Sequence, residues 1–234
     1  MTRLRTRAAS QRGFTMIEML VALLAAGIIS TASLYTVIIS LHFSSNYQDR
    51  IDANQQGRIA MVRVIQALQS ACVAPQVPPV VAGSTATKLV VYSNQSDAAT
   101  IQPNLVTIQL ASGSLTMGTQ AWSSGNYPNY VFSSTVTNFT LLPHAAQATL
   151  NGTGSQPVFQ YFGYTAGGVL STTAYAVPLS AANAATTAEV TVAFQALPTD
   201  SQSALGRGTN FNDSVVLRLT PASGDATASN APCT

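Results

Sequence analysis

Residues 12–20 read Arg12-Gly13-Phe14-Thr15-Met16-Ile17-Glu18-Met19-Leu20, and this stretch decides how the rest of the chain is organised. Four arginines precede Phe14, and from Phe14 to Phe43 the only formal charge is that of Glu18. Thirty helical residues reach about 45 Å, whereas the hydrocarbon core of a bilayer is about 30 Å thick, so residues 14–43 can span a membrane. A carboxylate in such a segment costs roughly 2.5 kcal/mol or more at mid-bilayer depth, which makes Glu18 a candidate functional residue.

The arginines before the apolar segment predict its orientation and its kind. Positive charge on this side predicts a cytoplasmic N-terminus and an extracytoplasmic C-terminal part. Two alternatives are a secretory signal peptide and an ordinary signal anchor, in which Glu18 would be a tolerated polar residue near the interface. A signal peptide is disfavoured because the apolar character continues to Phe43 and the region 30–33 is only a weak cleavage site.

The composition indicates an uncharged polar surface on the remainder of the chain. The protein has 234 residues, of which only 8% are charged, against about 25% in a typical soluble protein. From Phe14 onward the chain has six Lys and Arg and eight Asp and Glu, so this part has a net charge of −2. We therefore expect no basic patch for nucleic acid.

The chain contains two cysteines, Cys72 and Cys233. An extracytoplasmic location favours a disulfide between them, which would close a very long loop and contribute about 4–5 kcal/mol in a chain-entropy model. Two unpaired thiols are the alternative.

The run Gly13-Phe14-Thr15-Met16-Ile17-Glu18-Met19-Leu20-Val21-Ala22-Leu23 resembles the processing and methylation motif of type IV prepilins and pseudopilins. The resemblance implies removal of residues 1–13 by prepilin peptidase, with cleavage between Gly13 and Phe14 and N-methylation of Phe14. It also implies that the apolar helix is retained, first in the cytoplasmic (inner) membrane and then in an extracytoplasmic filament. The implied partners are the peptidase, other pilin or pseudopilin subunits and the inner-membrane assembly platform.

Cleavage at this bond gives Glu18 a possible partner. It creates an amino group at Phe14, one helical turn from the carboxylate. In a bundle of such helices, Glu18 of an incoming subunit can pair with the Phe14 amine of a neighbour. Pairing offsets the desolvation cost of both charges, which would favour the assembled filament over the lone subunit.

The helical pattern continues beyond the apolar segment, so we expect residues 44–74 to form its amphipathic continuation. No proline occurs between Phe14 and Ala74, which predicts a helix without a kink up to about Ala71. The proposed stripe recurs at spacings of mostly three or four, and its members are Tyr47, Ile51, Arg58, Met61, Ile65, Leu68 and Cys72. Met61, Ile65 and Leu68 are expected to pack on strands of the head.

Residues 75–234 are expected to form a β-rich head with a loose, low-complexity tail from Ala222. Alternation predicts strands at 88–92, 105–110, 115–117, 131–141, 157–164, 169–170, 189–197 and 214–220. Ser112-Gly113 predicts a hairpin turn, and Ser180 is expected to cap a short helix over 180–187. The fold class is therefore α+β, a long N-terminal helix packed on an antiparallel β-sheet head. The order of the elements resembles PilW-like minor pilins and J-type pseudopilins.

No catalytic set, cofactor motif or metal-ligand pattern stands out in the sequence. His42 and His144 are expected to be incidental polar residues. Asn210, Asn212 and Asp213 offer oxygen ligands of the kind calcium prefers, but their spacing is not diagnostic. Trp122, Tyr127 and Tyr130 could form an adhesive surface, although aromatics that anchor loops are the favoured interpretation.

These patterns indicate a non-enzymatic minor pilin-like subunit, near the tip or in the initiation complex of a pilus. One alternative is a pseudopilin of a type II secretion or competence filament. The alternative from another class is a signal-anchored surface binding protein or enzyme.

Overall fold

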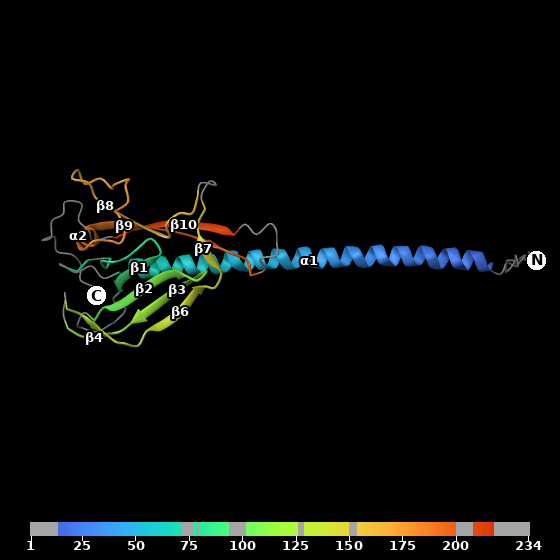
Figure 1. Ribbon diagram of the computed structural model, residues 1–234, viewed down its shortest axis with the longest axis horizontal. Helices are drawn as coiled ribbons and strands as arrows, with labels where there is room; N and C mark the ends of the chain where they lie inside the picture. The colour runs from blue at the N-terminus through green and yellow to red at the C-terminus, as the bar shows by residue number, and fades with distance from the viewer. Residues whose placement is uncertain are drawn as a thin grey trace, which may run out of the picture. The chain divides into compact units, whose positions relative to one another are not determined.

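A computed structural model gives the fold (Figure 1). It describes residues 14–71, 77–78, 80–93, 102–125, 129–149, 154–199 and 208–217. The chain divides into two compact units, residues 1–47 and 48–234.

A single helix, α1 (Met16–Gln69), runs through the first unit and into the second. It contains no proline, as expected, and it ends at a turn at Ser70 before Ala71 forms a β-bridge with Ser93. Among the described residues, α1 is the one helix long and apolar enough to cross a membrane. Its most apolar window has a mean hydropathy of 2.0 and contains no buried residue.

In the second unit one face of α1 is buried in the core of the head. The buried residues recur every three or four positions, and they are Ala53, Gly57, Ala60, Met61, Val64, Ala67 and Leu68. Met61 and Leu68 belong to the core as predicted, and Ile65 packs partly against it. The predicted stripe is wrong at Tyr47, Ile51 and Arg58, which are exposed, because the helix meets the strands through small residues at that level.

The first of the two larger sheets is antiparallel and has the strand order β1-β2-β3-β6. Its strands are β1 (Lys88–Ser93), β2 (Asn104–Ala111), β3 (Ser114–Gln120) and β6 (Thr137–Leu142). Ser112 and Gly113 connect β2 and β3 with φ values of 50° and 75°, which is the backbone of a tight hairpin turn. The predicted hairpin at these two residues is therefore confirmed.

A second antiparallel sheet has the order β10-β9-β7, and β8 also pairs with β9. Its strands are β7 (Ala145–Gln147), β8 (Phe159–Gly163), β9 (Thr187–Ala196) and β10 (Thr209–Val216). The short helix α2 (Ala181–Ala185) precedes β9, and Ser180 caps it as predicted, since its hydroxyl accepts from the Asn183 N–H at 3.2 Å. A small ribbon pairs β4 (Trp122–Ser124) with β5 (Val131–Phe132).

The core lies where the two larger sheets meet the buried face of α1 (Figure 1). Its largest fully buried side chains come from all three layers and include Leu68 of α1, Leu89 and Ile108 of the first sheet, and Phe159, Tyr161 and Phe194 of the second. The predicted α+β class, a long N-terminal helix with an antiparallel β head, is confirmed.

Several strand boundaries differ from the sequence-based prediction. The expected strand over 131–141 is interrupted at 133–136, so that β5 and β6 belong to different sheets. Residues 169–170 form only a bridge, between Leu170 and Tyr164. The last strand begins at Thr209 rather than 214, because its polar first half is held by pairing with β9.

Candidate functional site

The predicted processing and assembly residues lie at the start of α1. Phe14 is 80% exposed and stands just outside the helix, which begins at Met16. Glu18 is an exposed residue in the first turn. Gly13 lies outside the described residues, so the structure describes two of the three predicted positions.

Thr15 acts as the N-terminal cap of α1. Its hydroxyl accepts from the Glu18 N–H at 3.4 Å, and its carbonyl oxygen accepts from Glu18 and Met19 at 3.0 and 3.2 Å. A threonine followed three residues later by glutamate is the pattern of a capping box. The sequence analysis did not identify Thr15 as the cap, although the spacing Thr15-Met16-Ile17-Glu18 carries the signal. A carboxylate in the first turn also interacts favourably with the helix dipole.

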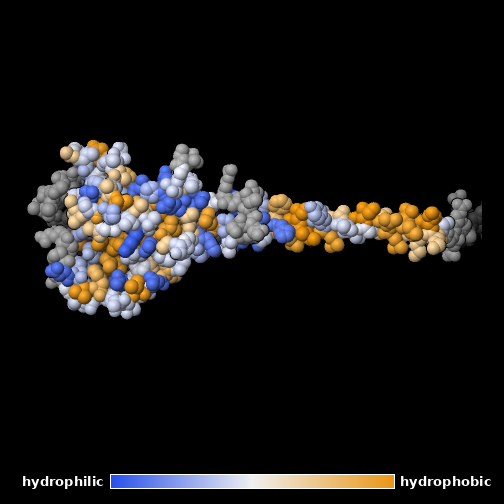
Figure 2. All heavy atoms as spheres, viewed as in Figure 1, coloured by the Kyte–Doolittle hydropathy of each residue, from blue (hydrophilic) through white to orange (hydrophobic). Residues whose placement is uncertain are grey.

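The first part of α1 exposes apolar side chains on the face seen in Figure 2, and all of residues 14–38 are exposed. Ile17, Leu23, Ile28, Leu34 and Leu41 are each more than 60% exposed. Monomeric soluble proteins rarely expose a continuous apolar surface of this extent, so the segment requires lipid or other helices around it. This fits a single-pass membrane segment.

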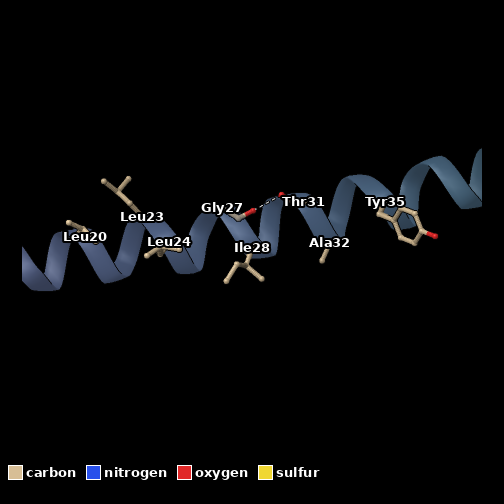
Figure 3. Close-up of a pocket in the computed structure, with 8 residues that line it drawn as sticks. All are labelled: Leu20, Leu23, Leu24, Gly27, Ile28, Thr31, Ala32 and Tyr35. Atoms are coloured by element: carbon tan, nitrogen blue, oxygen red, sulfur yellow. Dashed lines mark hydrogen bonds between the residues drawn. The ribbon is translucent and has the colours of Figure 1, made fainter.

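One side of this segment forms a shallow apolar groove, whose lining residues Figure 3 shows as sticks. They are Leu20, Leu23, Leu24, Gly27, Ile28, Thr31, Ala32 and Tyr35. Gly27 has open space where a Cβ would be, and the Thr31 hydroxyl donates to the Gly27 carbonyl oxygen at 2.8 Å. The polar hydroxyl is therefore satisfied within the helix, and the small residue allows a second helix to approach closely.

The predicted disulfide, Cys72 with Cys233, lies outside the described residues. His42 lies on α1, and His144 lies between β6 and β7, where its carbonyl oxygen accepts from the Leu197 N–H at 2.9 Å. In the described ranges, no three His, Cys, Asp or Glu side chains gather as metal ligands.

The candidate calcium residues lie along β10 and are engaged in the sheet. The Asn210 amide donates to the Thr149 carbonyl oxygen at 2.7 Å, and the Asp213 carboxylate accepts from the Ser214 N–H at 2.8 Å. Asn212 and Asp213 are consecutive in the strand, so their side chains point to opposite faces. This arrangement does not bring the three residues together as a ligand set.

Two of the three candidate aromatics hold the β4–β5 ribbon in place. The ring of Tyr130 lies 5.6 Å from that of Tyr92 and 6.1 Å from that of Phe132. The Trp122 indole donates to the Gly125 carbonyl oxygen at 3.0 Å. These contacts favour the role of loop anchors, and Tyr127 lies outside the described residues.

Comparison with known families gives one match. Residues 8–34 match the model described as the prokaryotic N-terminal methylation motif. No curated protein and no solved structure matches the chain.

The matched residues include Arg12, the Gly13–Phe14 bond, the Thr15 cap, Glu18 and the exposed apolar residues of α1 up to Leu34. The long helix and the β-rich head described above agree with the architecture that the sequence resemblance implies. The matched motif supports the type IV pilin and pseudopilin family for this chain.

Proposed function

We propose that the protein is a minor, non-enzymatic subunit of a type IV pilus, working near the tip or in the initiation complex. The observation that carries the proposal is the methylation motif at the start of a helix whose apolar window contains no buried residue. Such a helix is stable only in lipid or among other helices, and a subunit that moves from a membrane to a filament meets both in turn. The length of the chain, 234 residues, favours a minor subunit in this proposal.

Maturation would occur by cleavage between Gly13 and Phe14 and N-methylation of Phe14. In this proposal residues 1–13 are the removed leader, 14–43 the membrane and filament-core segment, 44–74 its amphipathic continuation and 75–234 the head. The leader arginines would hold the precursor's N-terminus in the cytoplasm. The partners would be prepilin peptidase, neighbouring pilin subunits and the inner-membrane assembly platform.

Glu18 would act in assembly by pairing with the Phe14 amine of a neighbouring subunit. The carboxylate lies one turn inside α1 and is exposed, so a neighbour can reach it. In lipid each charge alone is costly, and the pair offsets both costs. The capping contact at Thr15 would hold the first turn in shape until that neighbour arrives.

A Cys72–Cys233 disulfide would tether the C-terminal tail to the end of α1. A head outside the cytoplasm, as this proposal has it, would favour the disulfide, because disulfides persist in extracytoplasmic compartments.

The mass of the mature N-terminus tests the proposal. In cells that make prepilin peptidase, the wild-type chain should begin with N-methyl-Phe14, and a Gly13→Leu variant should keep its leader. Gly27→Leu, a substitution at the other glycine of this segment, should still be cleaved. A mature wild-type chain that starts before Gly13, or far beyond Phe14, would instead indicate a signal anchor or a signal peptide. Surface filaments that contain the protein would separate a pilus from a secretion or competence pseudopilus.

A further inference from the structure

The two edges of the first sheet differ in whether other backbone segments pair with them. The edge at β1 is covered, because the Val81 N–H donates to the Val90 carbonyl oxygen at 2.8 Å and Val80 and Ala71 form bridges with Val91 and Ser93. At the other end of the sheet β6 pairs with β3. Within the described ranges no second strand pairs with its outer side.

The exposed edge of β6 lacks the features that usually prevent strands from adding. Thr137–Leu142 reads Thr-Asn-Phe-Thr-Leu-Leu and contains no charge, proline or glycine. Natural proteins commonly protect an edge with lysine, an inward-pointing charge or proline. The edge strand of the second sheet, β10, does carry a charge at Asp213. The contrast marks β6 as a strand that can accept a partner.

A groove of about 520 Å³ lies between β6 and the exposed side of α1. Phe139 and Leu141 of β6 both line this groove, together with Ile59 of α1. Leu141 is buried, but Phe139 is 58% exposed, and Ile59 on α1 is 61% exposed. The groove therefore has an apolar floor that the head itself leaves uncovered at one end, within the volume range of ligand sites.

Arg63 is the only charged residue that lines this groove. It is exposed on α1, and no acidic residue lines the groove with it. An occupant with one carboxylate beside apolar side chains would thus complement the groove. Unpaired backbone on β6 adds the requirement that the occupant be extended.

We propose that β6 accepts an extended strand from the head of a neighbouring filament subunit, with an acidic side chain at Arg63 and apolar side chains over Ile59 and Phe139. The strand would add to the sheet by backbone hydrogen bonds, as in β-augmentation. The neighbour as its source rests on the proposed function, whereas the groove and its chemistry do not.

Hydrogen exchange on the full chain in detergent micelles tests the proposal. The probe is a peptide with the sequence of residues 209–216, Thr-Asn-Phe-Asn-Asp-Ser-Val-Val, which places an acid among apolar residues. It should slow exchange of the outward amides of residues 137–142 at least tenfold at saturation. The same peptide with lysine in place of the aspartate should protect them less, and a backbone N-methylated peptide should not protect them.

Two arginine variants give the matched comparison. Arg63→Glu should reverse the preference between the acidic and the lysine peptide. Arg58→Glu, which removes an exposed arginine that lines a different groove on the same helix, should leave it unchanged. Unchanged exchange in β1–β3 shows that each variant is folded.

The proposal is overturned by no protection of 137–142, by equal protection from both charged peptides, or by an equal effect of the two arginine variants. These results would leave the filament role standing if Phe14 is still the mature N-terminus. Protection by the peptide in a chain that is never processed would keep the docking site and remove its filament source.

Discussion

Gly57 of α1 packs directly against the ring of Phe211 in β10. A Cβ at Gly57 would lie 2.7 Å from Cζ of Phe211 and 3.0 Å from Cβ of Ala196. Phe211 in turn stacks on Phe194, with ring centroids 5.5 Å apart. The absence of a side chain at Gly57 therefore lets the second sheet close onto the helix.

Gly57→Ala should destabilise the head although alanine favours helix. The propensity gain is about 1 kcal/mol, whereas moving a packed aromatic ring costs about 1–3 kcal/mol. We expect a net loss of about 1 kcal/mol in the free energy of unfolding, measured by urea denaturation of the full chain in detergent. In a Phe211→Ala background the same substitution should be neutral or stabilising. Stabilisation by Gly57→Ala in the otherwise wild-type chain would contradict the packing argument.

Tyr161→Phe should also destabilise the head. The side chain is fully buried, and its hydroxyl donates to the carbonyl oxygens of Thr85 and Lys88 at 3.0 and 3.3 Å. Removing the hydroxyl takes this donor from the part-buried Thr85 and Lys88 carbonyl oxygens, at a cost of about 1–2 kcal/mol. The same urea titration measures it, with Tyr47→Phe as the control because Tyr47 is 64% exposed. Equal effects of the two substitutions would argue against the role of the buried hydroxyl.

The stability contributed by Tyr161 should depend on pH at values above the ordinary pKa of tyrosine. Burial raises the pKa of Tyr161 well above the ordinary value of 10.0, against a smaller lowering by the Ser84 hydrogen bond. The folded state then holds the phenol proton more tightly than the unfolded state, so stability is complete below about pH 10 and falls as the pH rises further. The difference in unfolding free energy between wild type and Tyr161→Phe should shrink from pH 10 to 11. A constant difference over that interval would refute this linkage.

Glu18→Ala should separate processing from assembly. We expect the variant chain to begin at Phe14 like wild type, because the cleaved bond is unchanged, but to be reduced at least tenfold in purified filaments. The loss follows because the Phe14 amine of a neighbour would remain unpaired in an apolar bundle. Glu18→Gln keeps the size and a capping oxygen without the charge, and it should fail in the same way. Normal incorporation of the glutamine variant would show that the charge pair is dispensable.

The Cys72–Cys233 disulfide should be visible in the mass of the unreduced extracytoplasmic protein. Peptide mapping is expected to recover the two cysteines in one cross-linked species that reduction separates. Reduction should lower the unfolding free energy, by up to about 4–5 kcal/mol in the chain-entropy model. Free thiol labelling of both cysteines in freshly isolated filaments would rule the pairing out.

Local signals in the sequence predicted the elements that local interactions stabilise. The tight turn at Ser112-Gly113 needs residues that adopt positive φ, and the Ser180 hydroxyl caps its own short helix. The break between β5 and β6 could not be predicted, because Val136 continues the alternation of the sequence. The contact of Val136 with the space above Gly118 exists only in the tertiary structure. The small strand β7 was also missed, since its three residues are held by pairing with the distant β9.

The features of the candidate site and of the groove beside β6 also separate into those that local sequence predicts and those that depend on the tertiary structure. The sequence by itself determined the motif, the lone carboxylate and the continuous helix, because each depends on neighbours within one or two turns. The tertiary structure alone decided which face of the second part of α1 is buried. The strands pack there against Ala53, Gly57 and Ala60 more closely than they could against larger residues. It also decided that Ile59 and Arg63 of α1 line one groove with Phe139 and Leu141 of β6, a relationship between segments far apart in the chain that no local pattern records.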